Sequence, residues 1–106
     1  MAWIYLLIAG IMEWGWPMGL KFGWTESGFR FWPIVLAVVC ILASGVFLLL
    51  AQKTIPVGTA YAVWTGIGAV GTFALGILLL GEPTHVARFV FVGFIVLGIV
   101  GLKMVS

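Results

Sequence analysis

The residue in this chain best suited to chemistry is Glu13, an acid in the middle of a long apolar run. Apart from Glu13, residues 1–20 carry no side-chain charge. In a helix over residues 2–20 its carboxyl lies near the midplane of a membrane, where an ionised acid costs about 2.5–3.5 kcal/mol on insertion scales. We therefore expect Glu13 to face a protein-lined or watery cavity and to exchange protons and cations there. The alternative is a permanently protonated carboxyl bonded to a neighbouring helix.

Small and aromatic residues share the predicted helix face of Glu13. Gly10 at i−3 leaves room beside the carboxyl, and Trp16 at i+3 carries an indole N–H that could donate to it. Pro17 at i+4 has no N–H for the Glu13 carbonyl, so a kink there would widen the cavity. Membrane helices also tolerate proline as simple packing variation, so both interpretations of Pro17 remain open.

A second group of aromatic and small residues lies in the third predicted span, within residues 58–71. Tyr61 and Trp64 offer an O–H, an N–H and aromatic faces to a carboxylate or a cation. Tyr61 could instead belong to the aromatic belt at the membrane interface. Gly66 and Gly68 permit either helix bending or plain close packing of helices.

The second and fourth predicted spans hold few groups that could do chemistry. Ser44 is a lone hydroxyl among apolar residues, which we expect to bond back to its own helix. The one cysteine, Cys40, is expected to be a small core residue. Three glycines in the last span suit close helix contacts and indicate an assembly role: Gly93, Gly98 and Gly101. No spacing resembles a metal cluster, a nucleophile triad or a phosphate loop, so we expect no enzyme, metal or cofactor.

The composition places these groups in a membrane. The chain has 106 residues, of which 64% are hydrophobic and 8% charged, and its mean hydropathy is +1.31. A soluble domain of this size could not bury so much apolar surface, and disorder needs low hydrophobicity. The net charge of +2 is no nucleic-acid footprint, because that needs clustered Lys and Arg. A membrane protein remains, in which each helical crossing needs roughly 20 apolar residues.

The few charges divide the chain into one domain, residues 1–106, of four short transmembrane helices. The predicted spans cover about residues 2–20, 31–52, 57–80 and 86–103. Helices are expected rather than a barrel, because continuous apolar runs lack the in-and-out alternation of barrel strands. Four crossings put two Lys or Arg on one side of the membrane and three on the other. This near balance leaves open either one orientation with a weak signal or insertion in both, which would allow an antiparallel homodimer.

The chain resembles the small multidrug resistance transporters over its entire length. The likeness rests on the four short spans, on Glu13 and on residues 56–71. Trp16, the run 58–68 and the closing run 98–103 are similar to the guanidinium exporter subtype of that family. The resemblance implies an all-α, antiparallel, dual-topology homodimer in a bacterial inner membrane, exchanging protons for a cation.

By motif position, the resemblance also implies which residues bind. Glu13 would bind both the proton and the substrate, with Trp16, Ser44, Tyr61 and Trp64 as its neighbours, and the last span would make the dimer contacts. The expected function is proton-coupled export of guanidinium and small substituted guanidiniums, with tolerance of hydrophobic or quaternary ammonium cations. The alternatives are a broad quaternary ammonium antiporter of the same family, a cation channel, and a scaffold subunit that transports nothing. Partners would be a second copy, the cation, protons and lipid, but no nucleic acid.

Overall fold

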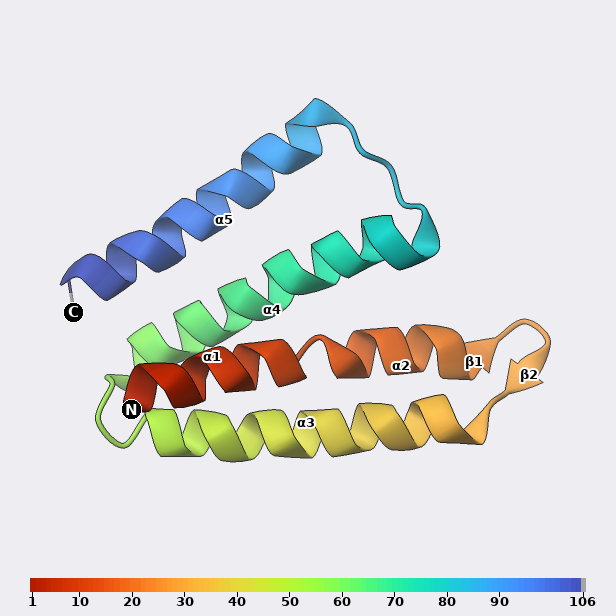
Figure 1. The fold of residues 1–106 in the computed structure, drawn as a ribbon, viewed down its shortest axis with the longest axis horizontal. Helices are drawn as coiled ribbons and strands as arrows, with labels where there is room; N and C mark the ends of the chain where they lie inside the picture. Colours follow the sequence, from red (N-terminus) through yellow and green to blue (C-terminus); the bar gives the residue numbers. More distant parts are fainter. Residues whose placement is uncertain (106) are drawn as a thin grey trace.

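The computed structural model describes residues 1–105 as five helices and one short hairpin (Figure 1). In chain order these elements are α1 (Ala2–Met12), α2 (Gly15–Gly23), β1 (Trp24–Thr25), β2 (Gly28–Phe29), α3 (Phe31–Ala51), α4 (Val57–Leu80) and α5 (Val86–Val105).

The helices lie in one flat layer. Figure 1 shows α1 and α2 following one another alongside α3, with α4 crossing α1 and α5 next to α4. The molecule measures 47 × 34 × 17 Å. A helix with its side chains is about 10–12 Å wide, so the layer is less than two helices thick. The N-terminus, the α3–α4 connection and the end of α5 lie at one end, and the hairpin and the α4–α5 connection at the other.

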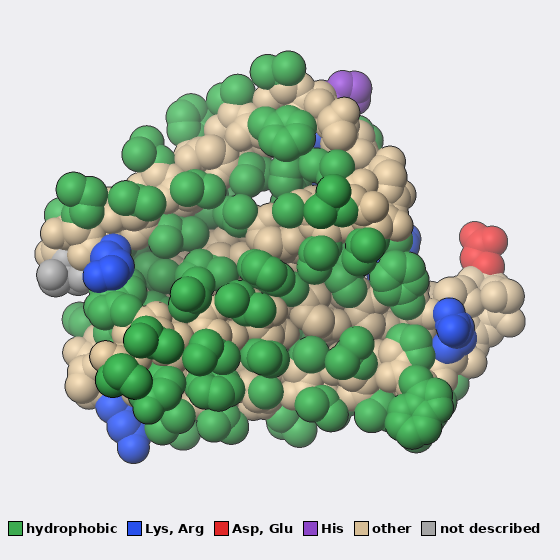
Figure 2. Space-filling model, in the orientation of Figure 1, with side chains coloured by type: hydrophobic (Ala, Val, Ile, Leu, Met, Phe, Trp, Pro, Cys, Tyr) green, Lys and Arg blue, Asp and Glu red, His purple; other side chains and the backbone are tan. Residues whose placement is uncertain are grey.

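Helices α3, α4 and α5 are each long and apolar enough to cross a membrane, with 21, 24 and 20 residues. At 1.5 Å per residue, 20 residues span about 30 Å, the thickness of the hydrocarbon core. In Figure 2 hydrophobic side chains cover the middle of the visible face, and the charged ones lie near its edges. The fold is therefore helical, with three apolar spans and a broken N-terminal helix.

The first helical segment differs from the single span predicted over residues 2–20. It is two helices, because α1 ends at Met12 and α2 begins at Gly15. Pro17 lacks the N–H that would bond the Glu13 carbonyl, and the Trp14 N–H bonds the Ile11 carbonyl at 3.1 Å, one residue short of the α-helical partner. Both turn residues keep right-handed helical dihedrals, with φ −63° at Glu13 and −66° at Trp14. The chain therefore bends at Glu13 without reversing.

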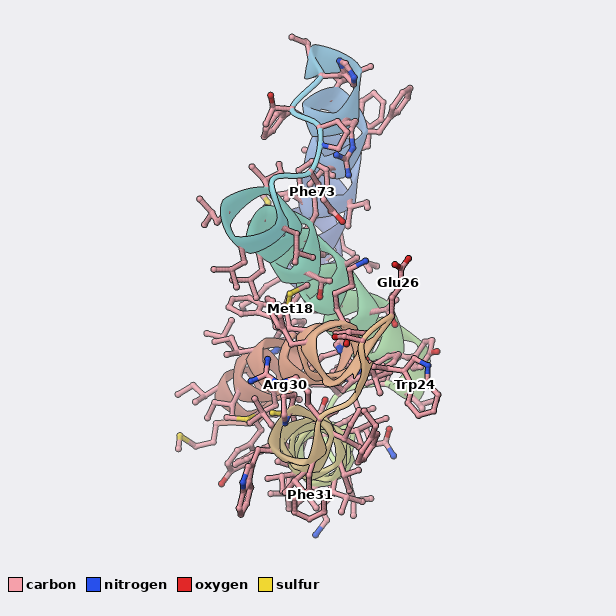
Figure 3. The ribbon with its side chains drawn as sticks, turned by 90° about the vertical axis from the view of Figure 1, so that its right-hand side faces the viewer. Met18, Trp24, Glu26, Arg30, Phe31 and Phe73 are labelled. Carbon is pink, nitrogen blue, oxygen red and sulfur yellow. The ribbon has the colours of Figure 1, made fainter. Side chains whose placement is uncertain are left out.

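The connection after α2 is a hairpin that we do not predict from the sequence. Strands of two residues are too short to show an alternating pattern, and Lys21 still lies in the last turn of α2. Trp24 pairs with Phe29 and Thr25 with Gly28 in antiparallel register. Gly28 has φ +128°, a conformation that only glycine adopts readily. Figure 3 shows Trp24 at this end of the molecule, and its ring packs edge-on against Phe29 at 6.0 Å.

Small residues let the helices approach closely. A methyl group at Gly15 would overlap the Cys40 sulfur, and one at Gly19 would lie 2.9 Å from the Cβ of Ala37. Such contacts hold α2 against α3, since lipid tails give helices no hydrophobic reason to associate. Cys40 accordingly packs at the α2–α3 contact, partly buried, as a small side chain.

Helix α5 packs mainly on α4. Ile99 lies over Gly66, where an added Cβ would be 2.6 Å from its Cδ1. The last helix has no buried residue. A Cβ built at any of its three glycines meets no atom within 4 Å in the described chain: Gly93, Gly98 and Gly101. These glycines lie on a face of α5 that no described residue covers.

Candidate functional site

A pocket of about 490 Å³ opens at the break between α1 and α2. It draws its walls from the break itself, from α3 and from one face of α4. The lining residues are Glu13, Trp16, Pro17, Ile41, Tyr61, Trp64, Thr65, Gly68, Ala69 and Thr72.

Glu13 lines this pocket, and no described residue pairs with one of its carboxylate oxygens. Its side chain lies directly over Gly68, where an added Cβ would be 2.8 Å from the Glu13 Cγ. The Oε1 atom is buried without a hydrogen-bond partner among residues 1–105, and so is the indole Nε1 of Trp16. A buried polar group left unpaired costs about 1–3 kcal/mol. The unpaired carboxylate oxygen points to a proton or to a ligand with N–H donors, and the unpaired Trp16 N–H borders the same pocket.

Ser44 links three helices behind Glu13. It is fully buried and donates to the Ala9 carbonyl at 2.8 Å, while accepting the indole N–H of Trp64 at 2.7 Å. The prediction that Ser44 bonds back to its own helix is therefore wrong, because Ala9 belongs to α1. The same carbonyl accepts the backbone N–H of Glu13 at 3.0 Å. The Trp64–Ser44 bond thus ties α4 and α3 to the helical turn that carries Glu13.

Tyr61 and Trp64 form an aromatic pair at the pocket. Their ring centroids are 5.2 Å apart and their planes are inclined at 45°. Trp64 donates its N–H to Ser44, so the group that Trp64 offers to a cation is the face of its ring. Tyr61 is 57% exposed and lines the pocket, so it lies at the rim.

Comparison with known proteins agrees with this arrangement. The family model described as Small Multidrug Resistance protein matches residues 1–95. The chain belongs to the small multidrug resistance family. It is 52% identical over 106 residues to a guanidinium exporter of Yersinia pestis, with the whole of both chains covered. It is 51% identical over 104 residues to a guanidinium exporter of Citrobacter freundii, covering 98% of this chain and 97% of that one.

As a member of the small multidrug resistance family, the chain is a multi-pass transport protein of the bacterial inner membrane. This agrees with a pocket built from one carboxylate and aromatic rings. Among the residues that the structure describes, no group of three or more His, Cys, Asp or Glu could hold a metal ion.

Gly10, Gly66 and Gly68 each lie at a helix contact. Gly10 packs against Ile67 of α4, where an added Cβ would be 2.7 Å from the Ile67 Cβ, so it serves the α1–α4 contact. Helix α4 runs unbroken through Gly66 and Gly68. Pro17 lines the pocket one turn after Glu13.

Trp14 lies beside the site and supports it, a role that our reasoning from the sequence missed. Its indole Nε1 donates to the Ile67 carbonyl at 2.9 Å, and its ring lies over Gly71, where a Cβ would overlap it. Glu13 and Trp14 therefore rest on Gly68 and Gly71, two glycines one helical turn apart. That spacing in α4 was the available signal for a close contact.

Two threonines of the pocket were also missed. Thr65 and Thr72 are seven residues apart, so they lie on one face of α4. Gly68, between them, lies on that same face, and this periodicity was the signal. Their hydroxyls add hydrogen-bonding oxygens to a wall that is otherwise apolar or aromatic.

Proposed function

We propose that this protein exports guanidinium and small substituted guanidinium cations in exchange for protons. The observation that carries the proposal is the buried, unpaired Glu13 Oε1 in a pocket bordered by aromatic rings. Guanidinium is planar, and its N–H groups form a fork that matches a carboxylate. The names of the relatives at 51–52% identity support the same substrate.

Each wall of the pocket has a role in this proposal. In the bound state the guanidinium fork binds the Glu13 carboxylate, and the Trp16 N–H, which is unpaired without a ligand, donates to the same carboxylate. The Trp64 ring lies against the face of the cation, and the hydroxyls of Thr65 and Thr72 accept its outer N–H groups.

Exchange follows from competition for one carboxylate. A proton or a cation at Glu13 removes the cost of an unpaired charge at membrane depth. An empty, ionised site keeps that cost, so the protein changes its access from one side to the other mainly when it is occupied. No ATP-binding motif is found in the sequence, and the proton gradient would drive export.

The working unit in this proposal is an antiparallel pair of chains. Two observations support it: the uncovered glycine face of α5, and the near balance of Lys and Arg between the two ends of the helices. A second copy in the opposite orientation would bring a second Glu13 to the pocket. Two copies related in this way replace the internal inverted repeat of larger transporters.

A broad quaternary ammonium antiporter is the second candidate. The pocket, at about 490 Å³, is roomier than guanidinium needs, and two aromatic rings border it. A quaternary ammonium has no N–H donor, so it would rely on charge, ring faces and this spare volume. We expect such cations to be tolerated beside guanidinium.

Proton release tests the exchange directly. Guanidinium is added to detergent-solubilised protein in weak buffer with a pH dye, and the Glu13→Gln variant is the matched control because it keeps the size and loses the charge. We expect release from the unmodified protein and none from the variant. Equal release from both would refute Glu13 as the exchange site. A channel or a scaffold would give no release, and release by quaternary cations alone would favour the second candidate.

Labelling tests the orientation separately. Gln52 is exposed just after α3, so Gln52→Cys in a Cys40→Ala background gives one reactive thiol in the second connection. In intact cells we expect an impermeant maleimide to label about half of the chains, since near-equal charges favour both orientations. Complete or absent labelling would reject the antiparallel pair.

A further inference from the structure

A groove lined by apolar side chains runs between α4 and α5, and at one end also along α1, on a different face of α4 from the Glu13 pocket. Three neighbouring cavities of about 420, 400 and 350 Å³ form it. Adjacent cavities share lining residues: Ile67, Ile99 and Val100 line the first two, and Val70 and Ala74 line the second and third. Figure 2 shows an opening between α5 and α4 in this part of the molecule.

The groove uses its own face of α5. Phe89, Val92, Val96 and Ile99 line it at spacings of three, four and three residues, which is one stripe along a helix. The glycines of α5 do not line it, and they face open space. A second chain that packs on the glycine face would therefore leave the groove uncovered.

A basic residue stands at each end of the groove. Lys103 lines the first cavity and lies 4.6 Å above the Trp3 ring. At the other end Arg88 lies 4.8 Å above Phe73, which lines the third cavity and lies between the α4 and α5 ribbons in Figure 3. Arg88 also donates to the Pro83 carbonyl, which uses one of the five N–H donors of a guanidinium.

The length of the groove matches lipid. Arg88 and Lys103 are 15 residues apart in α5, which is about 22 Å along the helix at 1.5 Å per residue. One leaflet contributes about half of the roughly 30 Å hydrocarbon core. At about 22 Å the groove is longer than one leaflet and shorter than two, so it holds the full acyl chain of one lipid, which enters beside either basic residue.

We propose that this groove binds an anionic phospholipid, with an acyl chain between α4 and α5 and the phosphate at Arg88 or Lys103. Apart from Lys103, the lining is apolar throughout, so a water molecule in the groove would find few hydrogen-bond partners. Acyl chains need no such partners, and in a membrane they surround the protein. Basic side chains at the membrane surface favour anionic over neutral headgroups. The proposal does not depend on which cation the Glu13 pocket carries.

Native mass spectrometry of the purified protein tests the headgroups. The probes are palmitoyl-oleoyl phosphatidylglycerol and palmitoyl-oleoyl phosphatidylcholine, which share acyl chains and differ in charge. We expect the glycerol lipid to be retained about fivefold better for each basic residue that holds it. Arg88→Gln with Lys103→Gln should abolish that preference. Lys21→Gln with Arg30→Gln removes the same charge away from the groove and should preserve it.

Filling the groove tests the acyl chains. Ala74→Leu occupies space in two of the three cavities, and Ala74 is exposed, so the chain should still fold. We expect it to reduce retention of both lipids and to leave the oligomeric state unchanged. Unchanged retention, equal binding of the two headgroups, or an equal effect of the control pair would overturn the proposal. Loss of the dimer in Ala74→Leu would also overturn it, because the occupant would then be a second copy.

Discussion

Replacing Gly71 by alanine should disturb Glu13 by displacing Trp14, although neither Gly71 nor Trp14 lines the pocket. Gly71 lies in α4 beneath the indole of Trp14, and an added Cβ would overlap that ring. Trp14 directly follows Glu13 and is held by its bond to the Ile67 carbonyl at 2.9 Å. The ring therefore has to move, and the turn that carries the carboxylate has to move with it.

The expected cost is the balance of three effects. Alanine stabilises a helix by about 1 kcal/mol over glycine. Overpacking costs about 1–3 kcal/mol. Loss of the Trp14 hydrogen bond costs about 0.6 kcal/mol on average for a bond between membrane helices, and at most about 1.7 kcal/mol. The net loss in the free energy of unfolding is then about 1–4 kcal/mol. Gly45→Ala is the matched control, because its Cβ meets no atom within 4 Å. It should be neutral or stabilise by up to about 1 kcal/mol.

The measurement is unfolding by SDS in mixed micelles, followed by guanidinium-induced proton release from the folded fraction. Gly71→Ala should unfold at lower SDS than Gly45→Ala and release fewer protons. Adding Trp14→Phe should recover part of the loss in Gly71→Ala, since the smaller ring removes the overlap. If Gly71→Ala and Gly45→Ala are equally stable and equally active, the proposed contact between Trp14 and Gly71 is refuted.

Three further predictions concern the pocket itself. Glu13→Asp should retain proton release with weaker cation binding, because its carboxylate is one methylene shorter; complete loss of release would contradict this. Ser44→Ala and Trp64→Phe each break the same bond, so a double-mutant cycle on unfolding should give a coupling of about 0.6–1.7 kcal/mol, and additive effects would contradict the bond. Trp16→Ala and Tyr61→Phe should weaken guanidinium binding more than that of a bulky quaternary ammonium, measured by calorimetry, because only guanidinium needs oriented hydrogen bonds. Equal losses for the two cations would argue against those roles.

The sequence predicts helices and a membrane because those features need only composition and charge. Uncharged runs bounded by Lys53 and by the residue pair Glu82–Pro83 mark the ends of α3 and α4 within a few residues. Glu13 stands out for the same reason, since a charge in an apolar run is visible without any knowledge of packing. A bend near Glu13 is one of the two interpretations that Pro17 leaves open, because proline removes a backbone donor at a known position.

The contacts between helices could not be predicted from the same information. Whether Ser44 bonds its own helix or α1 depends on which face of α3 meets α1, and an apolar helix gives almost no sign of this. Trp14 was overlooked for a related reason: a tryptophan in a membrane span is ordinary until Gly71 is known to lie beneath it. The hairpin from Trp24 to Phe29 is too short for a periodic signal.

The positioning of Glu13 explains how a carboxylate can be fixed and still be free to exchange its ligand. The bonds that hold it are made by its neighbours and by its backbone: the Ala9 carbonyl binds Ser44, and the Trp14 indole binds the Ile67 carbonyl. Its side chain is supported from below by Gly68, through contact at Cγ and not through the carboxyl group. The Oε1 atom is therefore kept in place without being paired, and a ligand gains its full hydrogen bond on arrival. Had the fold used this oxygen as a helix–helix bond, a cation or proton would have to break that bond first, and binding would weaken accordingly.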